Sequence, residues 1–211
     1  MKNTVIYLIT HSEASVRGNI KSISTNENKN ISDEKLILSV SGEKNAEAMS
    51  KNKELQNIDA VYASNYVRAI GTAKYIAQEN NTIVNVDDRL NKRRVGNLDN
   101  YEWAEYMRLQ AKNFDFKMPG GESMNQVKRR MTLSIKNILM FEAENRVAVV
   151  SHRMSITALL LAWCDIGYNY NGDIILSYNE QTIIDGSFEV PRVIKVTFDG
   201  MNVIDITAIN I

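Results

Sequence analysis

The stretch VIYLITH, residues 5–11, is an apolar run that ends directly at a histidine, and the stretch VAVVSH, residues 147–152, repeats this pattern. Runs this short and this rich in β-branched residues are typical of buried strands in a parallel sheet. His11 and His152 are the only two histidines of the chain. Because ligands bind beyond the carboxyl ends of parallel strands, we expect both imidazoles to face one crevice.

Elsewhere in the chain, short β-branched segments alternate with longer amphipathic ones, which indicates an α/β fold with parallel strands. In chain order we expect a helix over 41–56, a strand over 58–64, a helix over 67–78, a short strand over 82–86, a helix over 101–112, a helix that opens at Ser123, a helix over 154–164, and closing strands over 174–184 and 193–209. Ser123 and Gln126 have the spacing of a capping box. The polar stretch 19–35 is expected to be a surface loop.

Composition excludes several classes of function. The 25 basic and 25 acidic residues of the 211-residue chain cancel, so we expect no nucleic-acid partner. The single cysteine, Cys164, excludes an intrachain disulfide and favours a reducing compartment, so a cytoplasmic location is expected. The longest apolar run, residues 158–164, is too short to span a membrane. Two histidines without a vicinal carboxylate pair predict neither a metal nor another cofactor.

Five motifs around the histidines occur in a defined order. They are Thr10-His11-Ser12-Glu13, then Leu38-Ser39 with Gly42, then Ser64 with Arg68, Ala69, Thr72 and Ala73, then Gly121-Glu122-Ser123, and finally Ser151-His152. In these motifs, and over nearly its whole length, the chain resembles the histidine phosphatase superfamily of phosphoglycerate mutase-like proteins. The resemblance implies one domain over residues 1–211 with a three-layer α/β/α fold and a mostly parallel central sheet. It also implies a lid or insertion over the less regular residues 87–120.

The resemblance further implies a phosphatase that works through a phosphohistidine. His11 would be the nucleophile, because a neutral imidazole attacks phosphorus near pH 7, while His152 and Arg68 would hold the phosphoryl group. Additional contacts to the phosphoryl group or an inorganic anion are expected from four further residues: Ser12, Arg17, Lys92 and Arg153.

Three positions depart from the pattern of this family. Thr10 stands where the family has a phosphate-binding arginine, and Ser12 replaces a glycine. Lys92 stands where many members carry the acidic glutamate that protonates the leaving group. Glu13 and Glu122 match other family positions, yet neither is assigned as the acid. We therefore expect low activity or a preference for good leaving groups such as aryl or acyl phosphates. The alternative is a catalytically inactive relative that binds a phosphorylated metabolite or partner; phosphoglycerate mutase activity is least favoured.

Overall fold

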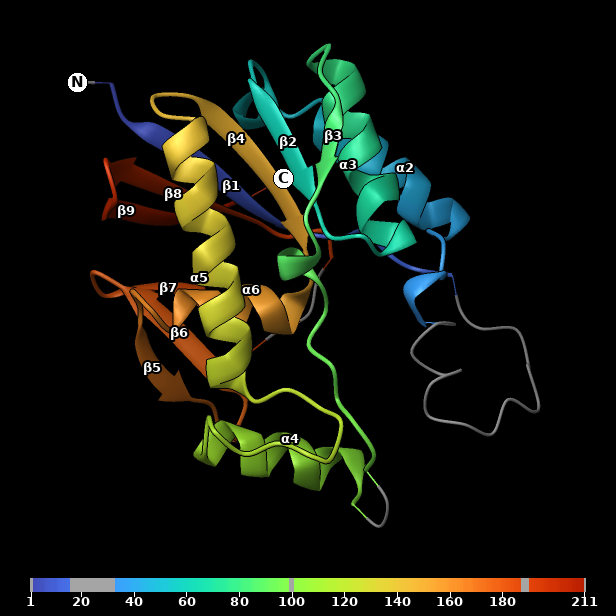
Figure 1. Ribbon diagram of the computed structural model, residues 1–211, viewed down its shortest axis with the longest axis vertical. Coiled ribbons are helices and arrows are strands. Elements are labelled where there is room, and N and C mark those ends of the chain that lie inside the picture. The colour runs from blue at the N-terminus through green and yellow to red at the C-terminus, as the bar shows by residue number, and fades with distance from the viewer. Residues whose placement is uncertain (1, 16–32, 99–100, 187–189, 211) are drawn as a thin grey trace.

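The computed structural model describes residues 2–15, 33–98, 101–186 and 190–210. Its central element is a six-stranded sheet with the order β3-β2-β4-β1-β8-β9 (Figure 1). The strands are β1 (Thr4–Thr10), β2 (Ala60–Ala63), β3 (Val84–Val86), β4 (Arg146–Ser151), β8 (Val193–Asp199) and β9 (Asn202–Ile209). β1 to β4 run parallel to one another, whereas β8 and β9 pair antiparallel at one side. The prediction of a mostly parallel central sheet is confirmed.

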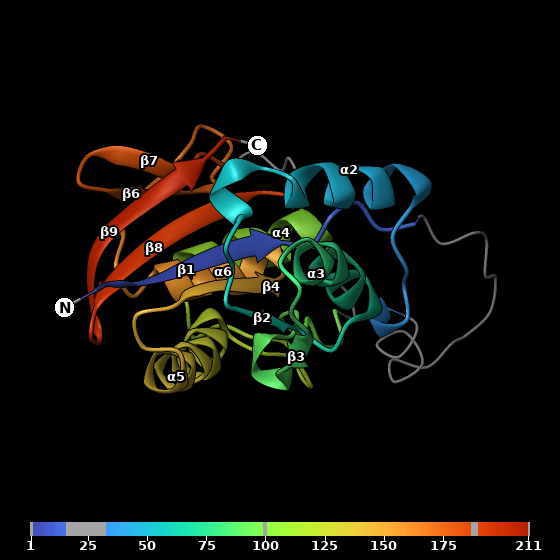
Figure 2. The ribbon, with the colours of Figure 1, turned by 90° about the horizontal axis from the view of Figure 1, so that it is seen from above.

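Helices cover both faces of this sheet (Figure 2). They are α2 (Val40–Ser50) and α3 (Val67–Glu79) on one face and α5 (Met124–Phe141) and α6 (Arg153–Leu160) on the other. In β1, Ile6 and Leu8 pack into the core beneath α5 and α6, while Tyr7 and Ile9 pack into the core beneath α2 and α3. A strand that is buried on both faces must be apolar at every position, which explains the unbroken run in the sequence. The three-layer prediction is confirmed.

The C-terminal third differs from the prediction, because each expected closing strand is a hairpin. The segment 174–184 divides into β6 (Ile174–Tyr178) and β7 (Gln181–Ile184), and the segment 193–209 divides into β8 and β9. Asn179 and Glu180 turn the first hairpin with positive φ, and Gly200 turns the second. An Asn-Glu pair lacks the Asn-Gly signal by which such turns are usually recognised. The expected helix over 154–164 ends at Leu160, and β5 (Asp165–Tyr168) joins β6 and β7 in a small antiparallel sheet.

The middle of the chain contains short elements. The predicted helix over 41–56 is α2 followed by a 3₁₀ turn, η1 (Lys53–Leu55), and a second turn, η2 (Asp88–Leu90), follows β3. α4 (Trp103–Lys112) lies apart from the large sheet and next to β5 (Figure 1), where the Tyr168 hydroxyl donates to the Ala111 carbonyl at 2.8 Å. One domain with a lid over 87–120 stays a prediction. Most of the polar stretch 19–35 lies outside the described residues.

The capping box at the start of α5 is confirmed: Ser123 Oγ accepts from the Gln126 amide, and the Gln126 side chain accepts from the Ser123 amide. None of the described helices combines the length and the apolar character needed to cross a membrane.

Gly42 fixes how the chain after β1 packs on α2. A Cβ atom at this position would lie 2.0 Å from the Glu13 carbonyl oxygen. Alanine normally stabilises a helix relative to glycine by about 0.5–1 kcal/mol. Here we expect the opposite sign, with Gly42→Ala lowering the free energy of unfolding by about 1–3 kcal/mol, as overpacking does.

Urea denaturation of Gly42→Ala and Gly167→Ala tests this steric effect. At Gly167 the nearest neighbour of an added Cβ is 3.9 Å away, so that variant is the matched control and should retain its stability. Equal stability of the two variants would contradict the close approach at Gly42.

Candidate active site

The carboxyl ends of β1, β2 and β4 meet at one edge of the sheet and bring three side chains together. His11, Ser64 and His152 directly follow these three strands. The His11 amide donates to the Ser151 carbonyl at 3.0 Å and so continues the ladder between β1 and β4. As a result the two imidazole centroids lie 5.0 Å apart with an interplanar angle of 67°. The expectation that both imidazoles face one crevice is confirmed.

A hydrogen bond to the backbone fixes the tautomer of His11. Its Nδ1 lies 2.7 Å from the Ser12 carbonyl oxygen, which can only accept, so Nδ1 carries the proton. Ser12 is itself held by its amide, which donates to Thr72 Oγ1 at 2.9 Å. His11 Nε2 therefore carries the lone pair of the imidazole, which is the pair that could attack an electrophile.

Arg68 contacts this lone pair directly. It lies in the first turn of α3 with only 3% of its surface exposed, and its Nε–H donates to His11 Nε2 at 3.0 Å. Its Nη1 donates to the Asp33 carbonyl at 2.6 Å, and its guanidinium carbon lies 4.8 Å from the Tyr66 ring centroid. The guanidinium thus lies beside the imidazole nitrogen at which a phosphoryl group would be received.

One hydroxyl controls where the proton of His152 lies. Ser64 Oγ is 2.8 Å from His152 Nε2 and 2.9 Å from Asn91 Oδ1. When the hydroxyl donates to Asn91, Nε2 must carry the imidazole proton; when it donates to Nε2, that proton moves to Nδ1. His152 Nδ1 is buried without a hydrogen-bond partner among the described residues. In the second of these tautomers, an incoming ligand oxygen would accept from the Nδ1 proton and satisfy it.

Burial keeps both imidazoles neutral. Burial is the largest cause that lowers the pKa of His11 to about 4, and the charges of Arg68 and Lys92 lower it further, against the hydrogen bond to Ser12. The pKa of His152 lies well below its ordinary value because of burial first and then its neighbours His11 and Arg68. A neutral imidazole is the form that attacks phosphorus.

Asp33 brings a carboxylate to this cluster of cations. Its Oδ2 lies 2.8 Å from Lys92 Nζ and 3.5 Å from Arg68 Nη2. The sequence gives no sign of this role, because Asp33 belongs to the polar stretch that was expected to be a surface loop. Lys92 does reach the site, where it pairs with this carboxylate.

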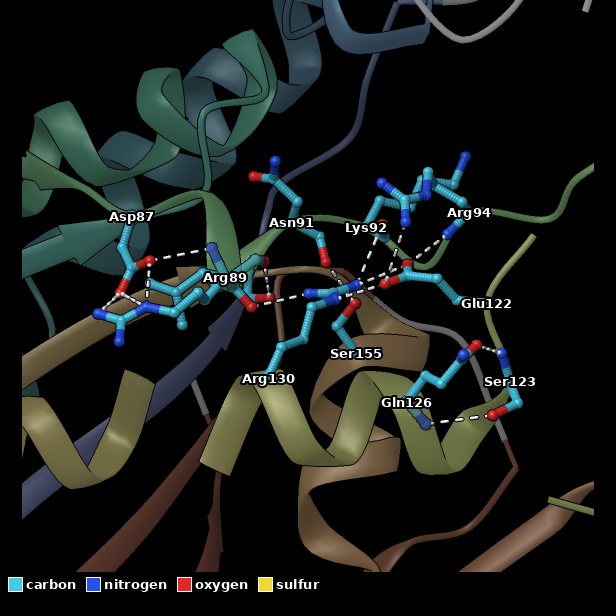
Figure 3. A network of polar contacts seen from close by, with 12 residues as sticks. Asp87, Arg89, Asn91, Lys92, Arg94, Glu122, Ser123, Gln126, Arg130 and Ser155 are labelled. Atoms are coloured by element: carbon cyan, nitrogen blue, oxygen red, sulfur yellow. Dashed lines mark hydrogen bonds and ion pairs between the residues drawn. The ribbon is translucent and has the colours of Figure 1, made fainter. Parts of the chain in front are cut away.

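The segment that carries Lys92 is anchored from below by α5 and α6 (Figure 3). Arg130 donates to the carbonyls of Arg89 at 2.7 Å and Lys92 at 3.3 Å, and its Nε donates to Glu122 at 2.8 Å. Ser155 Oγ donates to the Asn91 carbonyl at 2.8 Å. A buried polar network in which these groups are paired holds the backbone rigidly.

The imidazoles open into a cavity of about 660 Å³, which we call the strand-end cavity. Five cationic side chains line it, namely Arg68, Lys92, Arg93, Arg108 and Arg153. Among the described residues the carboxylates of its lining are Asp33 and Asp173. The large apolar side chains of its lining, which we call the apolar wall, are those of Trp103, Met107, Met124, Met154, Ile174 and Ile184. The cavity therefore suits an anion attached to an apolar or aromatic group.

The remaining predicted site residues have varied placements. Arg153 lines the cavity and donates to the Gly186 carbonyl at 3.5 Å, and burial lowers its pKa to about 9. Ser12 is fully buried and is not part of the cavity lining. Its contact with the site is the hydrogen bond between its backbone carbonyl and His11 Nδ1. Arg17 lies outside the described residues. Thr10 Oγ1 accepts from the Arg192 amide at 2.7 Å and is likewise not part of the lining.

Neither of the two glutamates that match family positions, Glu13 and Glu122, lines the strand-end cavity. Glu13 is exposed and accepts from Ser41 Oγ at 2.6 Å. Burial alone would raise the pKa of Glu122, but the hydrogen bonds from Arg130 and from the Arg94 amide outweigh burial and lower it. Glu122 is thus a structural anion of the network below the site.

No metal cluster is found: within the parts of the chain that the structure describes, no three His, Cys, Asp or Glu side chains are grouped so that they could hold an ion.

The fold and the paired strand-end histidines together define an α/β protein of the phosphoglycerate mutase-like type. A family profile described as "Histidine phosphatase superfamily (branch 1)" matches residues 6–197, and the chain belongs to this family. No curated protein sequence matches the chain significantly.

Among the solved structures with a similar fold, three with low sequence identity are named as phosphatases. A mycobacterial glucosyl-3-phosphoglycerate phosphatase is 16% identical with a TM-score of 0.67, covering 98% of this chain and 97% of that one. A putative α-ribazole-5′-phosphate phosphatase from Escherichia coli is also 16% identical with a TM-score of 0.66, covering 98% and 96%. The mycobacterial enzyme in complex with inorganic phosphate is 20% identical with a TM-score of 0.58, covering 75% and 77%.

The lowered pKa values of both imidazoles predict an acid-sensitive fold. Below about pH 6.5 the unfolded chain binds protons that the folded chain does not, so the free energy of unfolding should fall as the pH decreases toward 4. Proton–nitrogen NMR should show two neutral imidazoles at pH 5. The same sample in concentrated urea serves as the reference, with ordinary titration near pH 6.5. Titration of either folded histidine near 6.5 would contradict the assigned environment.

Proposed function

We propose that this protein is a phosphatase that transfers a phosphoryl group from a small substrate to His11. The observation that carries the proposal is the alignment of the nucleophile: Ser12 fixes the proton on Nδ1, and Arg68 points its Nε–H at Nε2. The family, and the phosphate complex of a structural neighbour, support phosphoryl chemistry at such a site.

The reaction has two displacements at phosphorus. His11 Nε2 forms a bond to phosphorus while the bond to the leaving oxygen breaks, and that oxygen leaves with the electron pair. Water then attacks the phosphohistidine, the N–P bond returns its electrons to Nε2, and inorganic phosphate leaves. For the first step, Arg68 must exchange its hydrogen bond to His11 for bonds to the phosphoryl oxygens. In the Nδ1–H tautomer, His152 donates to the same group.

We assign no residue as the general acid that would protonate the leaving oxygen. The carboxylate beside the cations, Asp33, accepts a hydrogen bond from Lys92 Nζ at 2.8 Å and is not assigned as the proton donor. Substrates whose leaving oxygen is stable as an anion, such as aryl and acyl phosphates, should therefore react best.

The second candidate function is a non-catalytic receptor for a phosphorylated metabolite or partner. Thr10 favours it, because the side chain at the position of the family arginine is hydrogen-bonded to Arg192 and contributes no donor to the cavity. Loss of one such donor costs about 10²–10³ in rate.

Turnover of aryl phosphates by the parent protein and by His11→Ala separates the two functions. We expect release of phosphate that rises steeply as the leaving phenol becomes more acidic, an acid-labile phosphoenzyme, and a loss of at least about 10³-fold in His11→Ala. Lys136→Ala, on the exposed face of α5, controls for handling and should retain the activity. Saturable phosphate binding without turnover in either protein would establish the receptor instead.

Asp33 competes with phosphate for the same cations, and this competition is measurable. Asp33→Asn should tighten the binding of inorganic phosphate about 3- to 30-fold in calorimetric titrations at fixed ionic strength, because one negative charge leaves the site. Asp205→Asn is the control for the loss of one negative charge elsewhere and should bind phosphate like the parent: Asp205 is an exposed residue of β9 and is not part of the cavity lining. Unchanged or weaker phosphate binding in Asp33→Asn would contradict the competition.

A further inference from the structure

Arg93 is a buried cation on the wall of the strand-end cavity. Only 3% of its surface is exposed, although the residue lines the cavity. The next residue, Arg94, has a side chain that is 63% exposed and pairs with Glu122. The chain therefore directs one arginine to solvent and the other inward, toward the cavity that contains His11.

The surroundings of Arg93 are nearly all apolar. Its Nη2 lies 3.4 Å from Met107 Sδ, its Nη1 lies 4.0 Å from Met124 Sδ, and its guanidinium carbon lies 5.2 Å from the Tyr106 ring centroid. Thioether sulfurs are weak acceptors, so these contacts leave most of the donor capacity unused. Arg93 Nε is buried without a hydrogen-bond partner in the described part of the chain.

No carboxylate among the described residues forms an ion pair with Arg93. Glu122 acts on it only electrostatically, because the Glu122 carboxylate is bound by Arg130 at 2.8 Å and by the Arg94 amide at 2.9 Å. Burial lowers the pKa of Arg93, against the opposing influence of Tyr106 and Glu122. A charge removed from water without a partner is costly, and an anion in the cavity would compensate it.

The chemistry of a guanidinium defines which ligand group fits. Its planar N–H groups match the two oxygens of a carboxylate or phosphoryl group and form charge-assisted hydrogen bonds. The cavity also has more cations than one transferred phosphoryl group needs. Arg68 and Lys92 already lie near His11, and Arg93 is an additional cation of the lining.

We propose that Arg93 binds a second acidic group of the substrate, a carboxylate or a further phosphoryl group carried by the leaving group, while His11, Arg68 and His152 hold the transferred phosphoryl group. This proposal rests on the proposed function for the place of that first group. The apolar wall, which includes Met107 and Ile174, would contact the carbon skeleton between the two anions.

Matched aryl phosphates test this second anion site. The 3- and 4-carboxyphenyl phosphates are compared with the corresponding carbamoylphenyl phosphates, which have the same shape without the charge. The amide has the better leaving group, so a preference for the acid does not arise from leaving-group chemistry. The phenylene bisphosphates distinguish a second phosphoryl group from a carboxylate as the preferred anion.

The readout is the ratio of kcat/KM between acid and amide, which a merely structural residue would not change. We expect the parent to favour the better acid isomer or bisphosphate at least about 10-fold, the ratio to fall to about one in Arg93→Met, and an intermediate ratio in Arg93→Lys, which keeps the charge and loses the planar fork. Arg129→Met removes an exposed arginine of α5 and should keep the parental ratio.

The same compounds are titrated as ligands of His11→Ala, with and without Arg93→Met, so the test does not depend on turnover. If the parent turns over nothing, a 10-fold tighter binding of the acid that is lost with Arg93 still supports the second site while the phosphatase proposal fails. A ratio below about two in the parent overturns the proposal, even where Arg93→Met does not fold. An equal preference in the parent and in Arg93→Met also overturns it and assigns the preference to other cations of the cavity.

Discussion

The hydrogen bond from the His11 amide to the Ser151 carbonyl is the constraint on which the rest of the site depends. It is the rung of the β1–β4 ladder just beyond the pair Thr10 and Ser151, and it places both histidines at the same level beyond the sheet. A shift of register by one residue would turn every side chain of a strand to the opposite face. In β1 such a shift would move Ile6 and Leu8 into the core that now contains Tyr7 and Ile9, and the reverse. The packing of the two cores therefore fixes the register of β1, and with it the distance between the imidazoles.

Burial at this edge of the sheet determines the charge state as well as the geometry. The imidazoles leave water together with Arg68, and the cost of a second and third positive charge in the same place is avoided when both histidines stay neutral. The result is a neutral His11 imidazole whose Nε2 accepts a hydrogen bond from a guanidinium, which is the arrangement on which the proposed phosphoryl transfer rests. The positive charge of Arg68 and Lys92 is only partly offset by the single carboxylate of Asp33.

Much of this arrangement is predictable from the sequence, because it depends on local patterns. The apolar runs before His11 and His152 predict buried strands, Ser123 and Gln126 predict a helix start, and parallel strands place their ends together. The hairpin at Asn179 and Glu180 is not predictable in this way, since those residues adopt positive φ without a glycine. Asp33 and Arg93 are also missed, because the first lies in a polar stretch without periodicity and the second has basic neighbours, Lys92 and Arg94, with no pattern that shows which side chain points inward. Their roles arise from tertiary contacts only.

Lys92 illustrates why a position-by-position comparison is a poor guide to the charge of a site. Read along the sequence, a lysine at the place of the family glutamate inverts the local charge. In space, Asp33 supplies a carboxylate 2.8 Å from the Lys92 ammonium, and it does so from a segment 59 residues away. The site therefore contains a carboxylate that is paired with both Lys92 and Arg68. For the proposed reaction, this pairing bears on the proton chemistry available to the leaving group more than on the ability of the cavity to attract an anion.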